Sequence, residues 1–114
     1  MARVVAFVPD LLFGSKVIEM LRTAGHEAIL VSDLSVLEPG QAEVLVVDLT
    51  VDAPERVAQV LAANTSELAK LAFFSHTESA VRELATQAGF HLVVPRSRMA
   101  REGGELVTRL VERG

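Results

Sequence analysis

Short apolar runs alternate along the chain with segments in which apolar residues are spaced three and four apart. Unbroken runs, rich in valine, lie at 4–8, 44–47, 71–74 and 92–94, and a more mixed run lies at 27–32. A strand that is covered on one face alternates apolar and polar residues, whereas an unbroken run indicates a strand that is covered on both faces. The pattern therefore predicts five strands, with the run at 27–32 near an edge of the sheet.

Helical spacing is found between and after these runs. Four segments carry it: 11–24, 54–64, 78–88 and 104–112. Between the second and third strands, Pro39 and Gly40 end any helix after a few residues. The second helix is therefore predicted to be vestigial, a turn or two at most. Residues 96–98 are predicted to form a loop between the fifth strand and the last helix.

Five strands that alternate with helices predict an α/β fold. Right-handed crossovers place helices on both faces of a parallel sheet, which makes a three-layer sandwich. The strand order expected for five such strands is 2-1-3-4-5, as in the flavodoxin-like fold. At 114 residues the chain is long enough for one core, so residues 1–114 are predicted to form a single domain.

Composition and charge exclude several functions. The formal net charge is −4, and Lys and Arg together number 11, so we expect no binding to nucleic acid or to anionic membranes. The absence of cysteine excludes disulfides, thiol catalysis and thiolate metal sites, and it fits the cytoplasm. No apolar run approaches the roughly 18 residues of a membrane span. The sequence therefore predicts a cytoplasmic protein that does not enter a membrane.

Polar residues follow the strands at the edge where the carboxyl ends of the strands meet. In open α/β sheets ligands bind at this edge, so these residues are the candidates for function. No second His or Cys stands at the spacing of a zinc site, and the chain has no glycine-rich phosphate loop. The candidate residues are Asp10, Asp48, Ser75, His76 and Arg96.

Several of these candidates also have a simpler structural interpretation. A lone Asp48 would cap the loop that follows its strand. Ser75 has the S-x-x-E spacing of a capping box with Glu78, which favours a role as a helix N-cap over the binding of an anion. His76 has a side chain that titrates near neutral pH and could act as a switch, but a loop histidine is more often simply exposed to solvent.

The alternating elements and the residues at the carboxyl edge make the chain similar to the receiver domains of bacterial response regulators. In that family, an acidic pair after the first strand binds Mg²⁺, and an Asp that ends the third strand accepts a phosphoryl group. A Ser or Thr ends the fourth strand, and a Lys ends the fifth. The resemblance places the phosphoacceptor on Asp48, the hydroxyl on Ser75, the lysine position on Arg96, and the acidic pair on Val8 and Pro9, with Asp10 beside it.

The departures from the family pattern imply weak metal binding. Mg²⁺ needs near-octahedral oxygen ligands, which Val8 and Pro9 cannot supply, so we expect no dedicated metal site and no cofactor beyond weakly bound Mg²⁺. Without the metal, transfer of a phosphoryl group to Asp48 loses positioning and charge neutralisation. Arg96 keeps the positive charge of the lysine, and its planar fork is predicted to contact the Asp48 carboxylate directly.

We therefore expect a stand-alone degenerate receiver-like domain that is not an enzyme. It is predicted to act in two-component signal transduction through an unidentified protein partner. Two alternatives stay open: a functional phosphoreceiver phosphorylated on Asp48, and a flavodoxin-like domain that binds a small molecule or an anion. We also expect a homodimer through the fourth helix, the fifth strand and the fifth helix. Four apolar residues of these helices would not all fit in so small a core, and exposed apolar patches tend to mark contacts. They are Val81, Ala85, Leu106 and Leu110.

Overall fold

Five parallel strands form one sheet in the order β2-β1-β3-β4-β5, as the sequence predicts. This computed structural model describes residues 2–38, 40–63, 65–75 and 79–113. The predicted vestigial helix is η1, a 3₁₀ helix of one short turn. In chain order the elements are β1 (Arg3–Phe7), α1 (Leu11–Thr23), β2 (Glu27–Val31), η1 (Leu34–Val36), β3 (Val44–Asp48), α2 (Ala53–Ala62), β4 (Ala69–Phe74), α3 (Ser79–Gln87), β5 (Leu92–Pro95) and α4 (Arg96–Arg113).

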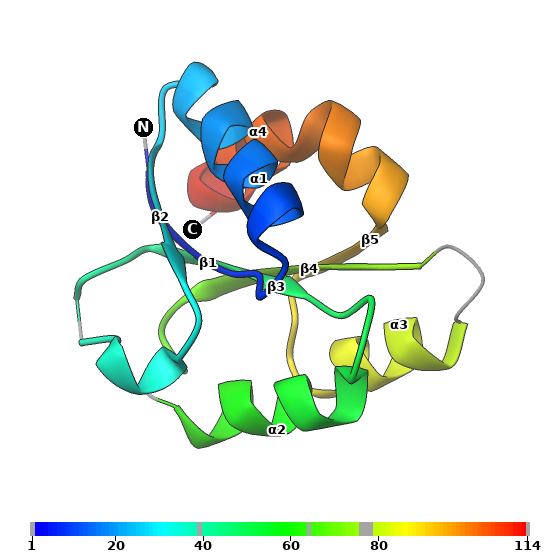
Figure 1. Cartoon of the computed structure of the whole chain (residues 1–114). Coiled ribbons are helices and arrows are strands. Elements are labelled where there is room, and N and C mark those ends of the chain that lie inside the picture. Colours follow the sequence, from blue (N-terminus) through cyan, green and yellow to red (C-terminus); the bar gives the residue numbers. More distant parts are fainter. Residues whose placement is uncertain (1, 39, 64, 76–78, 114) are drawn as a thin grey trace.

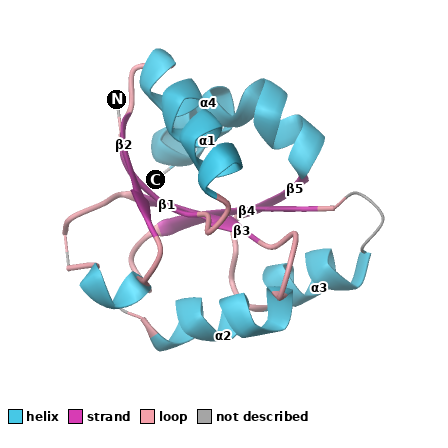
Figure 2. Ribbon diagram, viewed as in Figure 1, coloured by secondary structure: helices cyan, strands magenta, loops and turns pink. Residues whose placement is uncertain are grey.

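The helices cover both faces of the sheet and make the predicted three layers (Figure 1, Figure 2). α1 and α4 lie against one face, and α2, α3 and η1 lie against the other. The central strand β3 sends Val44 and Val46 into the core beneath α1 and α4, and Leu45 and Val47 into the core beneath α2 and α3. This two-sided burial is the cause of the unbroken apolar run. None of the described helices is long and apolar enough to cross a membrane.

α4 is longer than the sequence predicts. It begins at Arg96, so the predicted loop at 96–98 is wrong, and those residues form the first turn of the helix. The prediction that the helix starts near Gly104 is also wrong, because Gly103 and Gly104 lie in its middle, where α4 packs against α1. A Cβ on Gly104 would lie 2.5 Å from Cβ of Ala24. Gly104 is therefore required by the close approach of the two helices, whereas a Cβ on Gly103 would meet the flexible ends of Met20 and Met99.

The packing argument for a homodimer is wrong. Leu106 and Leu110 of α4 and Ala85 of α3 are buried, and Val81 of α3 is half-buried against the same core as Ala85. All four side chains fit because α3 and α4 lie on opposite faces of the sheet and contribute to separate cores. The homodimer through α3, β5 and α4 itself stays a prediction.

Candidate functional site

Asp48 ends β3 at the carboxyl edge of the sheet, as the sequence predicts. The residue is buried, with 5 % of its surface exposed. Oδ1 of its carboxylate accepts hydrogen bonds from the backbone N–H of Thr50 at 2.8 Å and from the Thr50 hydroxyl at 2.6 Å. A buried carboxylate is costly without partners, and Thr50, two residues further along the chain, supplies both of them. Asp48 therefore caps the loop that follows its strand.

Arg96 lies at the same edge but points to an aromatic ring. Its guanidinium stacks on Phe13 of α1, with Cζ 4.1 Å from the ring centroid, and Phe13 packs edge-on against Phe73 at a centroid distance of 5.2 Å. Among the described residues no hydrogen bond or ion pair joins Arg96 to Asp48, so the predicted contact is wrong. The planar arginine fork is well suited to an aromatic face, and Asp48 already has partners in its own turn.

Asp10 follows β1 and caps α1. Its Oδ1 accepts hydrogen bonds from two N–H groups of the first turn of α1, at 3.0 and 3.3 Å. At the two preceding positions, Val8 is buried in the core and Pro9 is exposed, and neither has a side chain that binds metal. Within the described ranges, no group of three or more His, Cys, Asp or Glu side chains could hold a metal ion. Asp10 and Asp48 are thus each bonded to their own helix or loop.

The other two candidates follow β4. Ser75 comes directly after the strand at the carboxyl edge and is partly exposed. His76 lies outside the described residues, as does Glu78, the partner of Ser75 in the predicted capping box. The structure therefore brings Asp10, Asp48, Ser75 and Arg96 to one edge of the sheet. The roles predicted for Ser75 and His76 stay predictions.

Solved structures share this arrangement of strands and helices. The non-phosphorylated HemR receiver domain from Leptospira biflexa is 14% identical over 97% of this chain and 94% of that one, with a TM-score of 0.76. A CheY-like receiver domain protein from Methanospirillum hungatei JF-1 is 13% identical over 98% of this chain and 95% of that one, with a TM-score of 0.80. The chain has the fold of a receiver domain.

This receiver fold is also similar to a predicted pilus assembly protein (cpaE) from Burkholderia thailandensis E264, at 13% identity over 98% of this chain and 99% of that one, with a TM-score of 0.80. No protein-family model matches the sequence, and no curated protein matches it either. At such low identities the similarity establishes the fold and leaves the activity open. The resemblance to receivers is confirmed for the fold.

Two further residues shape the edge of this receiver fold. The D-x-T spacing of Asp48 and Thr50 is a local signal for a side-chain turn, and the sequence could have shown it. Arg56 of α2 donates from Nη1 to the backbone oxygen of Asp48 at 3.4 Å, and its Cζ lies 5.9 Å from the ring centroid of Phe7. No local pattern identifies Arg56, because its partners lie on two different strands.

Proposed function

We propose that the protein is a degenerate receiver-type signalling module, not an enzyme, that acts through contacts with a protein partner and without Mg²⁺-dependent phosphorylation. One observation supports this most: Val8 and Pro9 stand where receivers have their acidic pair, and the neighbouring Asp10 is bonded to α1. The similar structures include a predicted pilus assembly protein beside response regulators, which supports an output through protein contacts. The proposal includes a cytoplasmic location, which the cysteine-free sequence fits.

A magnesium ion at this edge would have few ligands. Mg²⁺ demands near-octahedral oxygen geometry and loses its water reluctantly, so it is held by carboxylates that point at it together. Here Oδ1 of Asp10 is bonded to N–H groups of α1, and Oδ1 of Asp48 is bonded to Thr50. Each hydrogen bond to a charged acceptor contributes about 1.5–3 kcal/mol, and a metal that recruited Oδ1 of Asp48 would have to offset that loss.

The positive charge of Arg96 is engaged in packing. A phosphoryl group on Asp48 would need a nearby cation to neutralise its developing charge. Arg96 stands at the lysine position, but its guanidinium is stacked on Phe13 at 4.1 Å. Leaving this ring would forgo a cation–π contact of about 0.5–2 kcal/mol. The arrangement therefore favours a module whose output does not depend on a phosphorylated Asp48.

Incubation with acetyl phosphate and Mg²⁺, followed at short times by intact-mass spectrometry, tests the proposal. We expect no phosphorylated species, because Val8 and Pro9 supply no metal ligands and the guanidinium of Arg96, at the lysine position, is stacked on Phe13. Asp48→Asn is the matched control, since an adduct that persists in this variant does not report on Asp48. A phosphorylated species that disappears in Asp48→Asn would contradict the proposal and favour a functional phosphoreceiver.

A further inference from the structure

The outer edge of β2 presents backbone groups that are suited to a further strand. Among the described strands, β2 is hydrogen-bonded to β1 alone. The N–H of Glu27 donates to the Ala2 oxygen at 2.9 Å, so Glu27 faces β1. Because successive residues of a parallel strand direct their backbone groups to opposite sides, the N–H and C=O groups of Ala28 and Leu30 face away from β1. Such an edge is a template for pairing with an extended chain.

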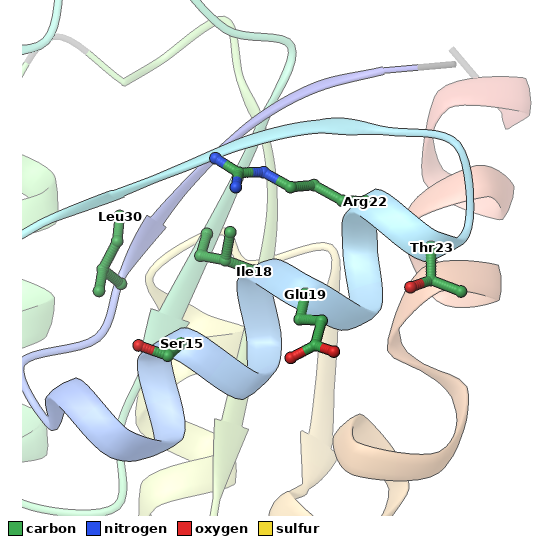
Figure 3. Close-up of a pocket in the computed structure, with 6 residues that line it drawn as sticks. All are labelled: Ser15, Ile18, Glu19, Arg22, Thr23 and Leu30. Atoms are coloured by element: carbon green, nitrogen blue, oxygen red, sulfur yellow. The ribbon is translucent and has the colours of Figure 1, made fainter.

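Arg22 covers this edge at Ala28, which is buried. It lies in the last turn of α1, and its side chain reaches across to β2 (Figure 3). There Nη2 donates to the Ala28 oxygen at 2.9 Å. An arginine has five N–H donors in a planar fork, so this one bond leaves most of its donors for another acceptor. A positive charge therefore stands directly beside the outward-facing backbone of β2.

Cavities lie on both sides of this edge, and Arg22 lines both. One cavity of about 620 Å³ lies between α1 and β2 and includes Ile18 and Leu30 (Figure 3). The other, of about 510 Å³, includes Ile29 and Gln41. Ile29 is paired with Val5, whose side chain belongs to the α2–α3 core, so the Ile29 side chain lies on that face of the sheet.

The shortness of η1 explains the second cavity. A full helix after β2 would cover this part of the sheet, but η1 is three residues long and Ile29 is 44% exposed. A strand that is added beside β2 would direct its side chains alternately to the two faces, one set toward Ile18 and Leu30 and the other toward Ile29. Both faces therefore have room and apolar surface for the side chains of an added strand.

We propose that the outer edge of β2 binds an extended segment of a partner protein that carries one carboxylate for Arg22. The backbone of the segment pairs with Ala28 and Leu30, and its carboxylate takes the Arg22 fork in a bidentate ion pair. The guanidinium then leaves the Ala28 oxygen, which becomes an acceptor for an N–H of the incoming segment. Glu19 and Glu27 flank the edge and would repel a run of acidic residues, so a single carboxylate suits the site best.

A second copy of this chain suits the edge less well than a partner segment. Two copies joined by their β2 edges about a twofold axis would place both Arg22 side chains at one shared edge, where like charges repel. The inference extends the proposed function, since it names the surface and the chemistry of the partner, but it rests on β2 and needs nothing from Asp48.

Amide chemical-shift mapping tests the inference with two capped five-residue peptides of alternating threonine and valine. One peptide has a central glutamate and the other a central glutamine. We expect saturable shifts of the Ala28 and Leu30 amides. The glutamate peptide should bind about fivefold tighter than the glutamine peptide, the upper end of what one exposed ion pair contributes, because the arginine pairs with the carboxylate in a bidentate geometry. Arg22→Gln should bring the two peptides to equal affinity. Lys16→Gln, which removes the same charge elsewhere on α1, should preserve the difference.

Three results would overturn the inference. One is the absence of saturable shifts at Ala28 and Leu30 up to about 5 mM peptide, a concentration at which even a weak specific contact would be detected. Another is equal affinity of the two peptides for the parent protein. The third is a shift of the same amides with protein concentration alone, which would assign the edge to a second copy. None of these results depends on phosphorylation of Asp48, so failure here is distinguishable from failure of the proposed function.

Discussion

Gly104→Ala should destabilise the protein, although alanine is the better helix former. In an exposed helix interior the change stabilises by about 1 kcal/mol. At position 104, the new Cβ would lie 2.5 Å from Cβ of Ala24, whose methyl group cannot rotate away because it is bonded directly to the backbone. The optimal separation of two carbons is about 3.5–4.0 Å, so α1 and α4 would have to move apart.

The expected net effect is a loss of about 2 kcal/mol in the free energy of unfolding. Overpacking of a tight contact costs about 1–3 kcal/mol, and a contact of 2.5 Å between two methyl carbons belongs at the upper end. The gain in helix propensity, about 1 kcal/mol, offsets part of it. Urea denaturation followed by circular dichroism measures the difference between the variant and the parent.

A double-mutant cycle with Ala24→Gly isolates the contact. Removal of the Ala24 methyl makes room for the new Cβ, so Gly104→Ala should be tolerated in the Ala24→Gly background, with a coupling energy of about 2–3 kcal/mol. If Gly104→Ala were as stable as the parent, or if the two changes were simply additive, α4 would not cross α1 at these residues and the reasoning would be refuted.

The remaining predictions concern β4 and the carboxyl edge. Lys70 is 7% exposed, and its burial lowers the pKa of its ammonium group below the ordinary 10.5. Between the lowered pKa of the folded protein and the ordinary pKa of the unfolded chain, the unfolded chain binds more protons. The free energy of unfolding therefore rises with pH in this range. Lys70→Met should remove this rise and stabilise the protein at neutral pH by about 1 kcal/mol in urea denaturation, and an unchanged pH dependence would count against it. Arg96→Gln should lose the stacking on Phe13 and about 0.5–1 kcal/mol of stability, whereas an unchanged melting temperature would show that the ring contributes nothing. Pro9→Asp should strengthen Mg²⁺ binding about tenfold, or about 1.4 kcal/mol, in a titration followed by the chemical shift of the Asp48 amide. No gain in affinity would show that the lack of the acidic pair is not what limits Mg²⁺ binding.

The sheet could be predicted from the sequence because the cause of each strand is local. Burial on both faces selects an unbroken apolar run, as at 44–47, and this pattern does not depend on which helix provides the cover. The vestigial second helix can be predicted for the same reason, because Pro39 and Gly40 limit its length whatever packs around it. The position of Asp48 followed from the same run, because it is the first polar residue after it.

The parts that were predicted wrongly or missed depend on distant segments. The sequence predicts Arg96 at Asp48, but its guanidinium stacks on the ring of Phe13, which α1 brings to the same edge. His26 has no neighbours in the sequence that mark it, yet it is buried, accepts the Ala2 N–H at Nδ1 and has Nε2 3.1 Å from the Gly104 oxygen. Contacts of this kind arise only when the layers assemble, so local patterns do not reveal them.

The carboxylate of Asp48 is bonded to its own turn and is not poised for a metal and a phosphoryl group. An NMR titration with Mg²⁺, alone and with the phosphoryl mimic beryllofluoride, tests it most directly by following the amides of Asp48, Thr50 and Arg96. We predict no saturable shift of these amides up to about 1 mM Mg²⁺, with or without the mimic. Saturable shifts with a dissociation constant below about 1 mM, which is roughly −4 kcal/mol of binding, would contradict the claim.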